Sequence, residues 1–434
     1  MDTIALASLA LAGSLLFLLA TGFWVALTLL AVGMIVMGLF TSTPMGSLIA
    51  STLWDASWGW ALTSLPLFIW MGEILFRSNL SADMFKGLAP WVQRFPGRLL
   101  HVNVLGCGIM AAVAGSSAVT CATIGRMSVP ELQKQKYPLN MTIGTLAGSG
   151  TLGLLIPPSI VMIVYGVTAE VSIARLFIAG ILPGLLLMGL FMAYTAVWSM
   201  LNASKMPPAQ PSIPFREKIY RSRRLIPVAL LIIGVVGAIY GGIATPTEAA
   251  TIGVIGALIL AAIGGGLTRE SFMDGLMAAM RTSCMISLII ACAACLTIAV
   301  AFVDIPRSLA SWVDAMDLSP YALLAVMAIF MLILGCFLEG ISIIVLTSSV
   351  VLPMVSAAGI DLLWFGIFLV VLIEAAQITP PVGFNLFVLQ AITGKNILQI
   401  TLAAIPFFLI LMVLLVLIVV FPEIVMVLPQ MMTR

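Results

Sequence analysis

The sequence predicts an all-α polytopic membrane protein that is built from two related halves. Hydrophobic residues make up 62% of the 434 residues and charged residues only 8%, whereas about a quarter of a soluble domain is charged. The mean hydropathy is +1.22. Apolar runs of the roughly 20 residues that a membrane-crossing helix needs occupy most of the chain. One interruption of such a run occurs twice, 223 positions apart, as Ile156-Pro157-Pro158-Ser159 and Thr379-Pro380-Pro381-Val382.

The paired Pro-Pro interruptions predict two helices that are broken inside the membrane, over residues 140–165 and 362–388. A proline in a helix removes a backbone hydrogen bond, and hydrocarbon tolerates the freed groups only where protein, water or an ion satisfies them. Two further proline pairs keep the same offset, Pro130 with Pro353 and Pro183 with Pro406. Broken helices at corresponding positions of two halves indicate the substrate site of a transporter.

Two other apolar segments, 99–132 and 320–356, carry small or polar residues at their centres. The central sequences are Gly115-Ser116-Ser117-Ala118 and Glu339-Gly340-Ile341-Ser342, and the same offset pairs Ser116 with Glu339 and Ser117 with Gly340. We expect each segment to form a re-entrant helical hairpin that enters and leaves on one side of the membrane. The two tips are then expected near the midplane, where irregular backbone must face protein or a polar cavity.

The basic residues predict the orientation, because Lys and Arg collect on the cytoplasmic side of a membrane. With both hairpins re-entrant and both termini outside, all 19 Lys and Arg residues lie inside except Arg175, Arg307 and Arg434. Residues 1–201 and 225–434 then form two halves of opposite orientation. The polar, basic stretch 202–224 is expected to be a cytoplasmic linker that also experiences anionic lipid.

The helix breaks and hairpin tips supply the candidate site residues. A broken helix exposes N–H groups at one end and C=O groups at the other, and each end carries about half a charge. The carbonyl ends suit a sodium ion and the amide ends suit a carboxylate. The candidate metal ligands are Ser116, Ser117, Ser149, Gly150, Gly153, Gly340, Ser342, Gln377 and Thr379. For any single small residue, close helix packing is the alternative explanation.

A second set of residues is predicted to contact the substrate or to couple its transport to an ion. These residues are Glu339, Glu374, Pro157, Pro158, Pro380, Pro381 and Asn385. An acid at mid-membrane costs about 2.5–3.5 kcal/mol on insertion scales and usually lines a cavity or a pathway. Salt bridging or protonation inside the helix bundle is the alternative for both glutamates.

The sequence gives little support for an enzyme. All six cysteines lie in apolar stretches without the spacing of a disulfide framework, and the lone Cys292-Ala293-Ala294-Cys295 pattern is typical of packing. An intramembrane hydrolase that uses Ser149 and His101 is one hypothesis, but the two residues belong to different predicted elements and no G-x-S-x-G motif supports it. We therefore expect no catalytic residue, no cofactor-binding residue and no nucleic-acid partner.

Four motifs, in the same order along the chain, resemble the large membrane subunit of tripartite ATP-independent periplasmic (TRAP) transporters. The resemblance spans nearly the whole chain. The motifs are Gly115-Ser116-Ser117-Ala118, the stretch from Gly150 to Ser159, Gly241-Gly242-Ile243-Ala244-Thr245-Pro246-Thr247-Glu248, and Thr379-Pro380-Pro381-Val382-Gly383 with Asn385-Leu386-Phe387.

The resemblance implies a sodium-gradient-driven importer of a small organic acid, which a periplasmic binding protein delivers. It also implies the elevator fold of the ion-transporter superfamily, with the hairpins and broken helices in a moving transport domain. A small four-helix membrane subunit is the expected partner in the bacterial inner membrane. The implied sodium (Na+) sites lie around Ser116 and Ser117 with the loop 149–153, and around Gly340 with the loop 377–381.

Two departures from the family pattern leave alternatives open. The second tip has Glu339 where an aspartate is expected, and the stretch before the second break lacks the usual asparagine and glycine. Proton coupling through Glu339 or Glu374 therefore stays open. A stand-alone sodium- or proton-coupled carboxylate carrier or ion antiporter of the same superfamily is the alternative function. The sequence does not reveal the substrate.

Overall fold

All elements that the computed structural model describes are helices, which confirms the all-α prediction for this part of the chain. The structure describes residues 3–78, 80–208, 214–223, 225–308, 311, 319–381 and 383–432, without the side chains of residues 3 and 80–82. Val382 and Arg434 lie outside the described residues, as do residues 209–213 and 224 of the predicted linker.

The first half of the chain contributes α1 to α10. Their bounds are α1 Thr3–Ala20, α2 Val25–Phe40, α3 Met45–Ser57, η1 Trp60–Thr63, α4 Ser64–Arg77, α5 Leu80–Val92, α6 Leu100–Ala114, α7 Ser117–Lys134, α8 Leu139–Thr151, α9 Ile160–Thr168 and α10 Ile173–Leu201. Helices α6 and α7 occupy the predicted hairpin segment 99–132, and α8 and α9 occupy the predicted broken helix 140–165.

The linker and the second half contribute the remaining helices. Their bounds are η2 Ala203–Lys205, α11 Phe215–Ser222, α12 Ile226–Tyr240, α13 Pro246–Ile263, α14 Arg269–Phe302, α16 Pro320–Gly335, α17 Gly340–Ala357, α18 Leu362–Ala376, α19 Phe384–Thr393, α20 Ile397–Val420 and α21 Glu423–Met431. Three starting residues repeat at the offset of 223: those of α1 and α12, of α7 and α17, and of α8 and α18. The sequence offset therefore extends to the helix boundaries.

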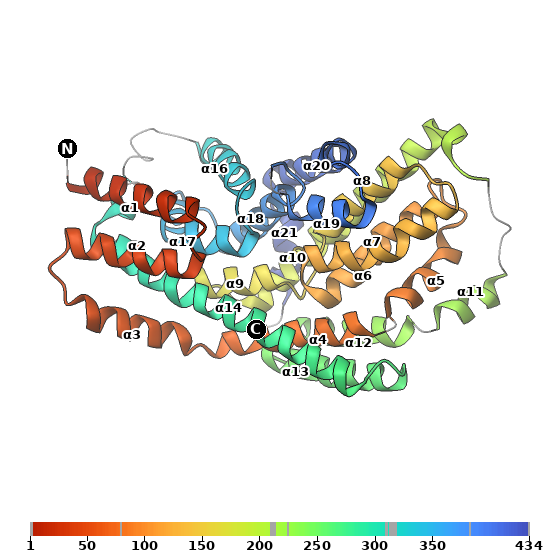
Figure 1. The fold of residues 1–434 in the computed structure, drawn as a ribbon, viewed down its shortest axis with the longest axis horizontal. Coiled ribbons are helices and arrows are strands. Elements are labelled where there is room, and N and C mark those ends of the chain that lie inside the picture. Colours follow the sequence, from red (N-terminus) through yellow and green to blue (C-terminus); the bar gives the residue numbers. More distant parts are fainter. Residues whose placement is uncertain are drawn as a thin grey trace.

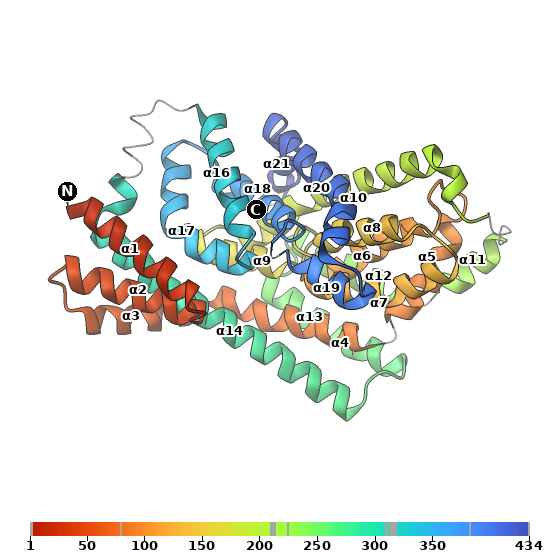
Figure 2. The same cartoon turned by 45° about the horizontal axis from the view of Figure 1, so that its top comes forward.

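The helices form two packed groups (Figures 1 and 2). In one group, the long helix α14 packs along α2, α3 and α4, while α13 packs on α4 and α12. In the other group, α8 packs against α6, α7 and α20, and α19 packs against α7. Helices α4 and α17 join the groups through contacts with α6, α9 and α14.

The helices that lead into the two breaks, α8 and α18, are almost completely buried. Every residue of α18 from Leu363 to Ala376 is buried, and so is every residue of α8 from Met141 to Thr151. Five other described helices are long and apolar enough to cross a membrane, namely α10, α13, α14, α17 and α20, and only 33% to 61% of their most apolar windows are buried. The polar breaks therefore lie at the centre of the protein, away from the surface that faces lipid.

Two apolar runs of the sequence, 45–76 and 282–303, do not coincide with single straight helices of the same bounds. The apolar run 45–76 is not one straight helix, because Gly59 has an extended backbone and α3 meets the following helix at a bend of 52°. The apolar run 282–303 belongs to a longer helix that begins at Arg269, because residues 269–281, which include four charged side chains, are helical as well. Hydrophobicity marked the membrane-crossing part of α14 and missed its polar extension.

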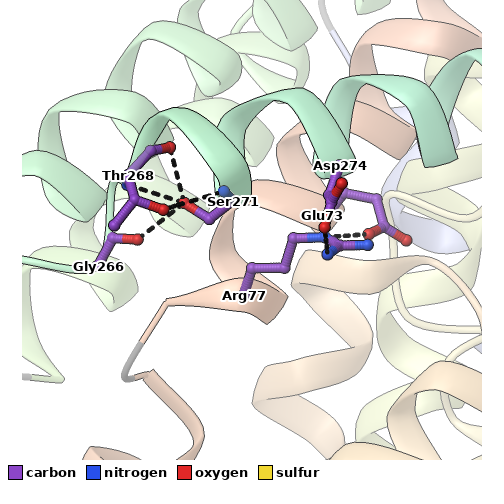
Figure 3. Close-up of polar contacts among 6 residues, drawn as sticks. All are labelled: Glu73, Arg77, Gly266, Thr268, Ser271 and Asp274. Carbon is purple, nitrogen blue, oxygen red and sulfur yellow. Dashed lines mark hydrogen bonds and ion pairs between the residues drawn. The ribbon is translucent and has the colours of Figure 1, made fainter.

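Local capping and an ion cluster fix the start of α14 (Figure 3). The Thr268 side chain accepts a hydrogen bond from the Ser271 amide at 3.0 Å, and Ser271 Oγ accepts one from the Thr268 amide at 2.9 Å. One turn later, Arg77 of α4 lies 3.1 Å from Glu73 and 3.6 Å from Asp274 of α14. These contacts connect the polar extension of α14 to the end of α4.

Candidate substrate and ion site between the two helix breaks

The first break separates α8 from α9 by a tightly turned loop. Helix α8 ends at Thr151, and the Leu154, Leu155 and Ile156 amides donate back to carbonyls of Thr151 and Leu152. The Pro157-Pro158 peptide bond is cis. Ser159 then begins α9 as its N-cap, with its hydroxyl accepting from the Met162 amide at 3.4 Å. The prolines therefore stop one helix, and a serine cap starts the next.

The tip between α6 and α7 lies directly against this loop. Gly115 ends α6 in the left-handed conformation, with φ +59°, and its carbonyl accepts from the Ile160 amide of α9 at 3.3 Å. An added Cβ on Gly153 would lie 2.6 Å from the Ser116 carbonyl oxygen and 2.9 Å from the Ser117 nitrogen. Glycine is the residue that permits both the left-handed turn and this close approach. The tip and the loop of the first break are therefore in direct backbone contact.

The second half of the chain also reaches the first tip. Ser117 Oγ donates to Asn385 Oδ1 of α19 at 2.8 Å, and both residues are buried. A Cβ on Gly150 would lie 3.3 Å from Asn385 Nδ2, which has no hydrogen-bond partner among the described residues. The sequence associated Asn385 with the second break, whereas the structure brings its side chain to the first tip.

A buried polar network extends from the first break into α6. Asn103 Nδ2 donates to Thr145 Oγ1 at 2.9 Å, and Ser149 Oγ contacts the Asn103 carbonyl at 3.4 Å and bonds the Thr145 carbonyl. Asn103 is fully buried, and its Oδ1 has no partner in the described part of the chain. Asn103 was not among the residues predicted from the sequence, although a lone amide within the apolar segment 99–132 was an available signal.

The second break is folded back on itself. The Gln377 carbonyl accepts from the Asn385 amide at 3.2 Å, and Thr379 Oγ1 donates to the Ala375 carbonyl at 2.7 Å. Pro380-Pro381 is also cis, as in the first break. A Cβ on Gly383 would lie 2.8 Å from the Gln377 carbonyl oxygen. After this turn, Asn385 lies in the first turn of α19, where its side chain contacts the first tip.

The second tip, between α16 and α17, packs on the end of α18. A Cβ on Gly340 would lie 2.5 Å from Cγ2 of Ile373, and Ser342 is buried one turn into the helix from Glu339. Glu339 itself is exposed at the start of α17, where its carbonyl accepts from the Ile343 amide. The second tip therefore lies next to Ile373, the residue that precedes Glu374. Glu374 is buried, whereas the Glu339 side chain is exposed.

Glu374 is fully buried in the last turn of α18, and neither carboxylate oxygen has a hydrogen-bond partner among the described residues. The Leu155 backbone of the first break lies beside this carboxylate, outside hydrogen-bonding geometry. An isolated carboxylate in this environment requires a compensating cation or a proton. Glu374 thus places a buried carboxyl group without a hydrogen-bond partner where the two breaks approach each other.

Ser149 and His101, the pair of the hydrolase hypothesis, form hydrogen bonds with other groups and not with each other. His101 Nε2 lies 2.5 Å from the Pro96 carbonyl oxygen, whereas Ser149 bonds the carbonyls described above. All six cysteines are free thiols. Within the described ranges, no group of three or more His, Cys, Asp and Glu side chains is arranged to hold a metal ion. The oxygen atoms around the two breaks belong to hydroxyl, amide and carbonyl groups and to the Glu374 carboxyl group, all of which are ligands for hard cations.

Comparison with known proteins identifies the family. Residues 12–424 match the family described as "Tripartite ATP-independent periplasmic transporter, DctM component". The chain belongs to the DctM family. It is 34% identical to the C4-dicarboxylate TRAP transporter large permease protein DctM of Pseudomonas aeruginosa over 88% of this chain and 89% of that one. It is 31% identical to the protein of the same name from Rhodobacter capsulatus, over 98% and 99% of the two chains.

The DctM family assignment and the apolar helices make this chain a multi-pass membrane transporter subunit. Its relatives are named as permeases, in keeping with the expectation of a transport protein. Among solved structures, the fold is similar to that of the YdaH transporter of Alcanivorax borkumensis, with a TM-score of 0.67 over 92% of this chain and 97% of that one. The sequence identity is 15%, so this likeness concerns the fold alone.

Proposed function

We propose that this DctM-family chain is the large permease subunit of a sodium-driven importer of small organic acids. The observation that carries the proposal is the junction of Ser117 with Asn385, because it joins elements of both halves at one buried polar centre. Hydroxyl and amide groups there suit an organic carboxylate or its coupling ion. The names of the relatives favour a C4-dicarboxylate or a similar acid.

The proposed mechanism is elevator-type alternating access. Residues 1–201 and 225–434 act as inverted repeats, a reading supported by the shared offset of their helix starts. The helix pairs α6–α7 and α16–α17 act as re-entrant hairpins and, together with the broken helices, form the transport domain. Helices of the group around α2, α4, α13 and α14 form the scaffold. Rigid movement of one such group against the other alternates the exposure of a site between repeats.

Sodium is the proposed coupling ion, and the central oxygens fit its chemistry. At the first site, Ser116, Ser117, Ser149, Gly150 and Gly153 supply hydroxyl and carbonyl oxygens. At the second site, Gly340, Ser342, Gln377 and Thr379 supply the corresponding groups. The buried carboxylate of Glu374 adds a negative charge that a cation would neutralise. Pro157, Pro158, Pro380 and Pro381 keep the backbone groups of the breaks available.

The proposed complex has two further proteins. One is a small four-helix membrane subunit that the scaffold holds, and the other is a soluble binding protein that delivers the substrate. The proposed location is the bacterial inner membrane, with both termini on the periplasmic side and the linker 202–224 in the cytoplasm. The family description, which specifies a tripartite periplasmic transporter, supports this assignment.

Reconstitution in proteoliposomes tests the proposal. The chain is incorporated with and without the small subunit, and the binding protein with radiolabelled substrate is added outside, with an inward gradient of sodium or of protons. We expect uptake only when all three proteins and the sodium gradient are present. Uptake by the chain alone would instead identify a stand-alone carrier, and uptake with only a proton gradient would overturn sodium coupling.

A further inference from the structure

Helix α11 of the linker carries unpaired positive charge on its surface. The only acidic residue of α11, Glu217, forms an ion pair with Arg221. Its Oε1 atom lies 2.5 Å from Arg221 Nη2 and 3.1 Å from Arg221 Nε. No carboxylate among the described residues pairs with Arg216, Lys218 or Arg223. We refer to these three residues as the basic patch. Such a patch attracts anions at its surface.

Aromatic side chains are interleaved with the basic patch. Trp91 of α5 packs edge-on against Phe215, with ring centroids 5.9 Å apart, and the Lys218 ammonium lies 5.8 Å from the Trp91 ring centre. The Arg223 guanidinium lies 4.2 Å from the ring centre of Tyr220. Trp91, Phe215 and Tyr220 are all exposed. Basic and aromatic residues combined in this way are typical of helices that lie in a membrane interface.

Hydrogen bonds attach the end of α11 to α5. Trp91 Nε1 donates to Ser222 Oγ at 2.7 Å, and Ser222 Oγ donates to the Gly87 carbonyl at 2.8 Å. Gly87 has no room for a side chain, because an added Cβ would lie 2.6 Å from Cδ1 of Leu225. The charges are therefore presented by a folded two-helix surface, which reduces the entropy lost when a ligand binds.

The position of α11 along the chain places the patch near the bilayer surface. The apolar helix α12 begins at Ile226, four residues after α11 ends, and the two helix axes meet at 65°. Because α12 is part of the membrane-embedded bundle, a helix bent away from it by this angle runs closer to the membrane plane. The exposed Phe215 and Tyr220 then face the region of lipid headgroups and upper acyl chains.

We propose that the α5–α11 surface binds the headgroups of anionic phospholipids through Arg216, Lys218 and Arg223. The phosphate of the lipid meets the cations, while Phe215 and Tyr220 contact the acyl chains. An acidic protein segment would satisfy the charges as well, but the exposed aromatic rings and the continuity with α12 favour a lipid. This binding does not depend on the transported substrate or on the coupling ion.

The test measures binding of fluorescent phosphatidylglycerol to the detergent-purified chain by anisotropy. Unlabelled phosphatidylglycerol, phosphatidylcholine and inorganic phosphate serve as competitors. The variant combines Arg216→Gln, Lys218→Gln and Arg223→Gln. Its matched control combines Arg269→Gln, Arg281→Gln and Lys395→Gln, which removes three exposed cations elsewhere on the chain. Thermal melting of each protein monitors folding.

We expect the patch variant to bind phosphatidylglycerol roughly a hundredfold more weakly, about fivefold per charge, and the control to bind within twofold of the wild type. If the triple variant does not fold, Arg216→Gln and Arg223→Gln are measured singly, with about a fivefold loss each. Equal losses in variant and control, or no loss in the variant, overturn the proposal. Equal competition by phosphatidylcholine or by inorganic phosphate also overturns it.

Discussion

Ser117 Oγ donates a 2.8 Å hydrogen bond to Asn385 Oδ1, joining residues that are 268 positions apart in the chain. Ser117 begins α7 beside the first break, and Asn385 begins α19 after the second break. One buried polar contact thus joins the start of α7 in one half of the chain to the start of α19 in the other. The second broken helix thus contributes a buried side chain to the surroundings of the first tip, and two of the experiments below address this junction.

The Ser117–Asn385 bond should be coupled in a double-mutant cycle. Ser117→Ala and Asn385→Ala each leave a buried polar partner unpaired, which costs about 1–3 kcal/mol, so each should lower uptake by roughly tenfold. The double variant should lose no more uptake activity than the less active of the two single variants, because both substitutions remove the same hydrogen bond. Thr393→Ala, whose hydroxyl bonds Leu389 within α19, is the control. Multiplicative losses in reconstituted uptake would show that the two residues act independently.

A methyl group at Gly153 should disrupt the contact between the first tip and the first break. The Cβ would lie 2.6 Å from the Ser116 carbonyl oxygen, which belongs to the backbone and has little room to move. Gly153→Ala should reduce uptake at least tenfold and lower the melting temperature. Gly189→Ala is the matched control, since no atom lies within 4 Å of its Cβ position. Wild-type uptake in the Gly153 variant would mean that the tip can shift without cost.

Replacing Glu374 should alter the response of the protein to sodium. Its carboxylate is buried without a partner, so Glu374→Gln keeps the shape and removes a charge that a bound cation would neutralise. A ligand that binds only the folded state raises the melting temperature. Replacing choline with sodium should raise the melting temperature of Glu374→Gln by less than half of the rise seen for the wild type. The exposed Glu339 provides the comparison, and its Gln variant should keep the full rise. An undiminished rise in the Glu374 variant would remove this residue from ion binding.

The ion cluster around Arg77 should contribute little to stability. The Arg77 side chain is 31% exposed and the Asp274 side chain is 62% exposed, so water screens the attraction between them. Exposed ion pairs typically contribute less than about 1 kcal/mol. Arg77→Ala should therefore change the melting temperature by only a few degrees and leave uptake near the wild-type rate. A large loss of stability would indicate that the end of α4 has a structural role that these contacts do not explain.

Much of the fold could be predicted because it depends on local patterns. Hydrophobic runs located most helices, and Pro157, Pro158, Pro380 and Pro381 located both interruptions. Where hydrophobicity and helix formation diverge, the prediction failed. Residues 269–281, which include four charged side chains, are helical with a start that Thr268 and Ser271 cap, and the linker contains α11, which packs on α5. Capping and tertiary contacts formed these helices, and hydropathy reports neither.

The sequence by itself determined the all-helical membrane class, the two breaks and the offset of 223 that relates their surroundings. Only the tertiary structure decided which residues meet. It turned Asn385 toward Ser117, buried Glu374 beside Leu155, left Glu339 exposed and revealed Asn103 next to Ser149. The physical reason is that a repeat fixes equivalent positions along the chain, whereas the site forms from contacts between non-equivalent elements of the two halves.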